Sequence, residues 1–144
     1  MRVLLDTNVV VSALLFPGPP RRLLRTLSAP PFELWTSRPL LRELAATLAY
    51  RKLAAAVART GLPVEDLVES YAGQVLLVPD DDLTSAPFPA DPSDAAVVAA
   101  ARAARVGWLV TGDRHLLEAQ RPTSCAVLRV TEALARATEL LAKG

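Results

Sequence analysis

Four acidic residues lie at points of the sequence where carboxylates could act together. Asp6 ends the apolar run "VLLD", Glu43 lies within "LLREL", Asp94 belongs to "DPSDAAVV", and Asp113 follows "LVTG". Carboxylates that are brought close together repel one another, and a divalent cation removes this repulsion while all of them stay ionised. Only oxygen ligands are on offer, without a cluster of Cys or His, so a site for Mg²⁺ or Mn²⁺ is favoured over a zinc site.

The segments that must position these acids alternate between strand and helix character. Short apolar runs typical of strands cover residues 3–5, 32–36, 74–78, 108–111 and 126–130. Helical spacing covers residues 21–27 and 40–48, a pair of helices within 51–71, residues 93–105, and a last helix from a cap at Thr131 to about Leu141. This alternation predicts an α/β fold with a mostly parallel sheet of four to five strands and helices on both faces.

The predicted topology brings the four acids to one edge of the sheet. In an open parallel sheet, ligands bind in the crevice outside the carboxyl ends of the strands. Asp6 ends the first strand, and Asp113 follows the fourth. Glu43 lies about one turn into the helix after the second strand, and Asp94 lies in the first turn of the helix before the fourth. We therefore expect all four carboxylates at this edge.

Each acid also has a purely structural interpretation. Asp6 could cap a helix that begins near Thr7, and Asp113 could be a turn residue beside Gly112. Glu43 falls on the flank of its helix, where a glutamate is usually solvated. The hypothesis of a shared site therefore depends on the coincidence of the four acids.

Asp94 is the acid for which spacing distinguishes the two interpretations. In "DPSD", Asp91 is predicted to cap the helix, and Asp94 has the position of an acid in a capping box. Asp94 also precedes Val97, Val98 and Ala101 by three, four and seven residues, which places it on the helix face that turns toward the core. A residue that only caps has no reason to point inward.

Composition favours one globular domain, residues 1–144, in the cytoplasm. The chain is 51% hydrophobic and 22% charged. No apolar run approaches the roughly 20 residues of a membrane span, no leader pattern precedes the first strand, and the lone Cys125 offers no disulfide framework. The net charge of +1 argues neither for nor against a polyanionic partner.

Four stretches of the sequence resemble the PIN-domain family. These are "LLDTNVVVSALL", "LLREL", "DPSDAAVVAAA" and "LVTGDRHLL". The family comprises metal-dependent ribonucleases, among them the VapC-like toxins of bacterial toxin-antitoxin pairs. The resemblance implies a Rossmann-like α/β/α sandwich, a site for Mg²⁺ or Mn²⁺ and an RNA substrate. By motif position, Asp6, Glu43, Asp94 and Asp113 match the acidic residues of the family, and Asn8 and Thr111 match polar positions that orient water or hold the acids.

The last motif departs from the family pattern at His115, where related sequences often carry a second acid. His115 could bind phosphate when protonated, act as a general acid, or simply cap a helix or lie on the surface. Arg38, Arg42 and Arg114 flank the acids in the sequence and are candidate RNA contacts, with solvated surface arginine as the alternative. The resemblance also implies a homodimer and a cognate antitoxin, for which residues 51–71 could supply an apolar contact surface or could equally pack inward.

Three other functions are alternatives to a PIN nuclease. A phosphatase of the haloacid dehalogenase type needs a second acid two residues after the first, where this chain has Asn8. A response-regulator receiver domain needs a lysine at a strand end, and neither Lys52 nor Lys143 has that position. The third alternative is a catalytically impaired PIN fold that binds RNA or serves in assembly, which the residue at position 115 leaves open.

Overall fold

The computed structural model describes residues 1–83, 92–118 and 125–144. The strands are β1 (Arg2–Leu5), β2 (Glu33–Thr36), β3 (Leu76–Leu77), β4 (Trp108–Val110) and β5 (Ala126–Leu128). The α-helices are α1 (Thr7–Leu15), α2 (Pro19–Leu27), α3 (Arg38–Leu48), α4 (Ala54–Thr60), α5 (Val64–Ala72), α6 (Pro92–Ala104), α7 (Arg114–Glu118) and α8 (Val130–Lys143). Two 3₁₀ turns, η1 (Arg51–Leu53) and η2 (Asp80–Asp82), complete these elements.

The five strands form one parallel sheet in the order β3-β2-β1-β4-β5. β1 lies in the centre, where Leu4 is paired with Trp35 of β2 on one side and with Leu109 of β4 on the other. The predicted α/β fold with a parallel sheet is therefore confirmed. All the strands point the same way, so their carboxyl ends share one edge.

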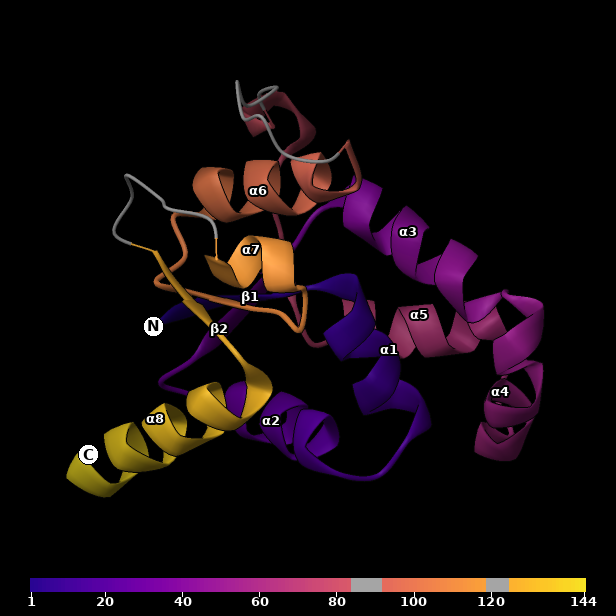
Figure 1. Ribbon diagram of the computed structural model, residues 1–144, viewed down its shortest axis with the longest axis horizontal. Coiled ribbons are helices and arrows are strands. Elements are labelled where there is room, and N and C mark those ends of the chain that lie inside the picture. The colour runs from indigo at the N-terminus through magenta and orange to yellow at the C-terminus, as the bar shows by residue number, and fades with distance from the viewer. Residues whose placement is uncertain (84–91, 119–124) are drawn as a thin grey trace.

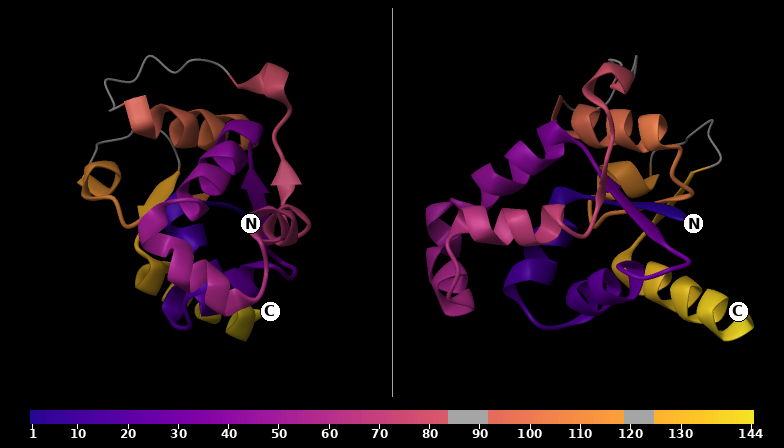
Figure 2. Two further views of the ribbon diagram at one scale, coloured as in Figure 1. Left: turned by 90° about the vertical axis from the view of Figure 1, so that its right-hand side faces the viewer. Right: turned by 180° about the vertical axis from the view of Figure 1, so that it is seen from behind.

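Helices cover both faces of the sheet because successive strand residues point to opposite sides. Val3 and Leu5 of β1 belong to a core cluster that includes side chains of α1, α2 and α8, whereas Leu4 belongs to a second cluster with α6. Figures 1 and 2 show α6 on one side of the strands and α2 and α8 on the other. The α3, α4 and α5 helices lie toward the end of the sheet where β1 leads into α1.

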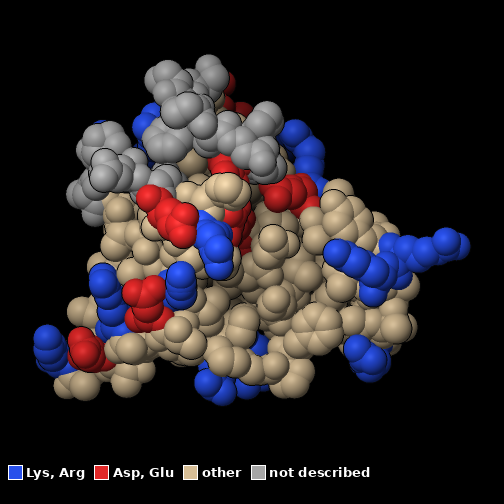
Figure 3. Space-filling view, in the orientation of Figure 1, with Lys and Arg blue, Asp and Glu red and all other residues tan. Residues whose placement is uncertain are grey.

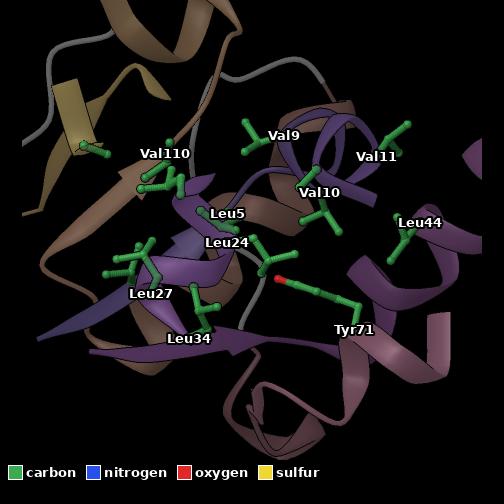
Figure 4. Close-up of a cluster of buried hydrophobic side chains, with 14 of the residues drawn as sticks. Leu5, Val9, Val10, Val11, Leu24, Leu27, Leu34, Leu44, Tyr71 and Val110 are labelled. Carbon is green, nitrogen blue, oxygen red and sulfur yellow. The ribbon is translucent and has the colours of Figure 1, made fainter. Parts of the chain in front are cut away.

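Tyr71 is the largest of the fully buried side chains in the first cluster. In Figure 4 its ring reaches from α5 into the cluster toward Leu24. Within the described part of the chain its hydroxyl has no hydrogen-bond partner. Burial raises the pKa of Tyr71, so the hydroxyl stays neutral.

Local sequence explains where several helices begin and end. Ser37 caps α3 and is followed by Pro39 in the first turn, where proline is tolerated. Gly61 ends α4 with φ 75°, a left-handed conformation that glycine adopts at little cost. The break at Gly61 separates α4 from α5, so the helical pair that we predicted within residues 51–71 is confirmed.

Three predicted boundaries differ from those in the structure. The last helix begins at Val130, not after a cap at Thr131, because Glu132 accepts a hydrogen bond from the backbone N–H of Arg129 at 3.1 Å and Arg129 is the cap, two residues earlier. This helix also continues past Leu141 to Lys143. β3 is reduced to Leu76 and Leu77, which lie at the edge of the sheet and are exposed.

None of the helices in the described ranges is both long enough and apolar enough to span a bilayer.

Candidate functional site

Asp6 lies at the carboxyl end of the central strand, and every polar group of its backbone and side chain forms a hydrogen bond. Its backbone N–H donates to the carbonyl of Val110 at 2.9 Å, which ties the end of β1 to β4. Its Oδ1 accepts from the backbone N–H of Thr7 at 2.8 Å and so caps α1. Its Oδ2 accepts from Oγ1 of Thr111 at 2.7 Å. Asp6 is thus a helix cap and at the same time a half-buried carboxylate at the sheet edge.

Thr111 joins two of the four acids. Its side chain is fully buried, and its Oγ1 donates to Asp6 while accepting from the backbone N–H of Asp113 at 2.9 Å. Oδ1 of Asp113 in turn accepts from the backbone N–H of His115 at 2.8 Å, which caps the short helix α7. The structural interpretation of Asp113 as a turn or cap residue therefore holds, and its charge still lies close enough to affect Asp6.

Glu43 and Asp94 approach Asp6 from two further helices. Glu43 is half-buried on α3, where it accepts a hydrogen bond from the Thr7 side chain and is close enough to be affected by the charges of Asp6 and Asp94. Asp94 is only 7% exposed in the first turn of α6. The inward orientation of Asp94, predicted from its spacing to Val97 and Val98, is confirmed.

The pKa values of Asp6 and Glu43 are raised mainly by burial and in part by the charges of neighbouring acids. Burial raises the pKa of Asp6, and the charge of Asp113 raises it further, while hydrogen bonds from Thr111 and Thr7 oppose the shift. Burial likewise raises the pKa of Glu43, with added repulsion from Asp6 and Asp94, against a hydrogen bond from Thr7. The repulsion runs in a row, from Asp113 to Asp6 to Glu43 to Asp94. We call these four residues the acid row.

The donor chemistry of the acid row suits a hard divalent cation, although its side chains are not gathered around a single point. Carboxylate oxygens are the ligands that Mg²⁺ and Mn²⁺ prefer, and partial burial of like charges gives a cation something to neutralise. Among residues 1–83, 92–118 and 125–144, no three Asp, Glu, His or Cys side chains are close enough together to form a ready metal site. One oxygen of Asp113 and both oxygens of Asp6 are engaged by N–H or O–H donors instead.

The sequence profile of the PIN domain matches residues 2–115 of the 144. The chain belongs to the PIN-domain family. A search of curated proteins finds no match. The family has a nuclease fold, its members are typically nucleases, and PIN domains generally bind divalent metals. The acid row thus lies in a PIN domain, at the sheet edge where an α/β fold binds its ligands.

The other predicted residues of this PIN domain lie in different surroundings. Asn8 is exposed at the start of α1, and together with Thr111 and Arg114 it lines a cavity beside the acid row. Arg42 and His115 are exposed. Arg38 is also exposed but forms an ion pair with Asp80 at 3.3 Å, so part of its charge is already compensated. The predicted cap Asp91 lies outside the described residues.

Two polar residues of the PIN domain that support the acid row were not predicted from the sequence. Thr7 is buried and connects Asp6, through its backbone N–H, to Glu43, through its side chain. Ser37 is fully buried, and its Oγ accepts from the backbone N–H of Leu40 at 3.3 Å at the start of the helix that carries Glu43. Thr7 directly follows the acid Asp6, and Ser37 directly follows the strand residue Thr36. These positions in the sequence could have indicated that both residues support the site.

Proposed function

We propose that this PIN domain is a metal-dependent endoribonuclease that hydrolyses RNA phosphodiester bonds. The observation that supports the proposal best is the acid row at the carboxyl edge of a parallel sheet, where burial and the charges of the neighbouring acids raise the pKa values of Asp6 and Glu43. Carboxylates are seldom buried beside one another without a charge to compensate them. In a fold of the nuclease family, such a cluster would bind the cation that compensates its charge and takes part in phosphodiester hydrolysis.

The residues of the acid row have separate tasks in this proposal. Asp6, Asp94 and Asp113 would hold Mg²⁺ or Mn²⁺, and Glu43 would orient a second ion or the attacking water. A bound divalent cation polarises the scissile phosphate and lowers the pKa of water. Thr111 keeps Asp6 and Asp113 in fixed positions through its two hydrogen bonds. Arg38, Arg42 and Arg114 would contact neighbouring phosphates.

The bond changes follow from attack by water on phosphorus. The water oxygen forms a new bond to phosphorus in line with the bond from phosphorus to the 3′ oxygen, which breaks. The proton lost by the water and the proton gained by the 3′ oxygen balance, so the products are a 5′ phosphate and a 3′ hydroxyl. Glu43 would accept the proton from the water, and its raised pKa would make it a stronger base than an ordinary glutamate.

A cleavage assay tests the proposed reaction. The full chain is incubated with single-stranded RNA in Mg²⁺ or Mn²⁺, with and without excess chelator, beside the Asp6→Asn variant. We expect cleavage that stops in chelator and in the variant, because the change keeps the cap on α1 but removes one negative charge from the row. Asp66→Asn, an exposed change on α5, is the matched control and should cleave normally. Undiminished cleavage in chelator would overturn the proposal.

The finer biological role is also part of the proposal. The resemblance to VapC-like toxins suggests a cytoplasmic ribonuclease toxin that pairs with itself and with a cognate antitoxin. Production of the chain alone in a bacterium should then slow growth, and production of Asp6→Asn at the same protein level should not. Equal growth inhibition by both forms would argue against a toxic ribonuclease activity.

A second candidate function is an RNA-binding or assembly module with impaired catalysis. Two observations favour it: an exposed histidine stands at position 115 in place of a second acid, and the described acids are not gathered around one point. The same cleavage assay separates the two functions. RNA that binds in a gel-shift experiment but stays intact in Mn²⁺ would support the module.

A further inference from the structure

A cavity of about 480 Å³ adjoins the acid row. Its walls come from the first two turns of α1, from the turn between β4 and α7, and from the start of α8. Pockets of about 300 to 1,000 Å³ are the usual size for small organic ligands. The cavity is therefore large enough for one nucleotide.

Two residues connect the cavity to the acid row. Thr111 lines the cavity and also donates its hydroxyl hydrogen to Asp6. Asn8, two residues after Asp6, lines the cavity from the start of α1 and is exposed. A ligand in the cavity thus lies next to the carboxylates rather than at a remote surface.

The lining combines an apolar part with a polar, positively charged part. Val9, Leu117 and Val130 supply apolar surface. Ser12 of α1 and Thr131 of α8 supply hydroxyls. Arg114 and Arg129 also line the cavity and are exposed. Neither arginine forms an ion pair with a described residue.

We propose that this cavity binds one unpaired nucleotide of an RNA substrate, next to the bond that is cleaved. The inference rests on the proposed function, since it names a subsite of the same active site. An apolar surface with flanking hydroxyls and an amide suits the face and edge of a base, and guanidinium groups suit its phosphate. A base can enter such a cavity only after it leaves a helical stack, so the substrate at this position is single-stranded.

Four of the eleven residues that line the proposed subsite lie outside the part of the chain that the PIN-domain profile matches. Arg129 and Thr131 follow residue 115, whereas Asn8, Ser12 and Arg114 precede it. The matched region supplies the acid row, and the start of α8 completes the cavity beside it. We therefore expect the start of α8 to influence which nucleotide is held, while the acid row influences whether the bond breaks.

Binding of mononucleotides in the absence of metal tests the subsite without relying on cleavage. The full-length ¹⁵N-labelled chain is titrated in chelator with each of the four ribonucleoside 5′-monophosphates and, separately, with ribose 5-phosphate. We expect shifts of the amide resonances of Ser12, Gly112 and Thr131, and tighter binding of at least one nucleotide than of ribose 5-phosphate. Equal binding of all five compounds would show that only phosphate is recognised and would overturn the proposal.

Substitutions on one helix provide the matched comparison. Arg129→Gln should weaken nucleotide binding about fivefold, because a charged hydrogen-bond donor to the phosphate is lost. Arg136→Gln, an exposed change on α8 that does not line the cavity, should leave binding unchanged. Ser12→Leu should obstruct the cavity and abolish the shifts. Melting curves of each variant show that it is folded.

The outcomes separate this inference from the proposed function. If nucleotides bind the cavity but RNA is never cleaved, the subsite stands and the ribonuclease proposal fails. If RNA is cleaved while nucleotides do not shift these amides, or Arg129→Gln binds nucleotides like Arg136→Gln, the subsite is wrong and the ribonuclease proposal stands.

Discussion

Thr111 connects acidic residues that belong to different strands. One hydroxyl group donates to Asp6 after β1 and accepts from the backbone N–H of Asp113 after β4. The group is fully buried, so neither bond is exchanged readily for a bond to water. Removal of the hydroxyl would leave a carboxylate oxygen and a backbone N–H short of partners in a low-dielectric environment, which is costly.

Thr111→Val tests this connection, since valine keeps the shape of threonine and lacks the hydroxyl. We expect the free energy of unfolding to fall by about 1 to 3 kcal/mol and RNA cleavage to decrease. Thr111→Ser keeps the hydroxyl and should restore most of the cleavage. The measurements are urea denaturation and cleavage rates for the three proteins. A valine variant as stable and as active as the wild type would show that the two bonds matter little.

At the residue scale, the sequence predicts the direction of a side chain better than it predicts the residues to which that side chain binds. The inward face of Asp94 follows from its distance to Val97 and Val98 along one helix, because helix periodicity is a local property. The hydrogen bond between Thr7 and Glu43 depends on how α1 lies against α3, and no local pattern contains that information. The ion pair of Arg38 with Asp80 was missed for the same reason.

At the element scale, Ser37 determines how the helix that carries Glu43 begins. Its hydroxyl accepts from the backbone N–H of Leu40 and is fully buried. Ser37→Ala should lower the free energy of unfolding by about 1 kcal/mol, the usual cost of losing a helix cap. Ser70→Ala, an exposed change within α5, should leave stability almost unchanged. A thermal melt of both variants checks the prediction, and equal melting temperatures would contradict it.

Elements with a strong apolar pattern could be predicted from the sequence, whereas the residues at which they begin and end were predicted less accurately. The central strand β1 and the helices α3 and α6 lie close to their predicted positions, because each buries a periodic set of side chains. The end of β5 and the start of α8 could not be placed well, since the apolar residue Val130 suits either a strand or a helix. The hydrogen bond from the backbone N–H of Arg129 to the Glu132 side chain stabilises the helical start at Val130.

At the scale of the whole molecule, the acid row should make the metal-free protein less stable as pH rises. The pKa values of Asp6 and Glu43 are raised in the folded state, so the folded protein binds more protons than the unfolded chain at intermediate pH. The stabilising contribution of these groups is complete below their ordinary pKa of about 4 and is lost as pH rises through the raised values.

Denaturation in chelator at about pH 5 and about pH 8 tests this linkage. Between the two pH values, wild type should lose more stability than Asp6→Asn, because the variant lacks one titrating group and relieves repulsion on Glu43. Saturating Mn²⁺ should reduce the loss in the wild type, since a ligand of the native state stabilises it. Parallel pH dependence of the two proteins would indicate that the pKa shift of Asp6 is small.

The central claim is that the four acids hold a divalent cation together, and the most direct test is to count bound Mn²⁺. Free Mn²⁺ is followed by electron paramagnetic resonance as it is titrated into wild type, Asp94→Asn and the control Asp66→Asn. Asparagine at position 94 keeps an oxygen acceptor but not the charge that a metal ligand needs. We predict saturable Mn²⁺ binding by the wild type and the control, and binding weakened at least tenfold, about 1.4 kcal/mol, in Asp94→Asn. If Asp94→Asn binds Mn²⁺ as the wild type does, the acid row is not the metal site.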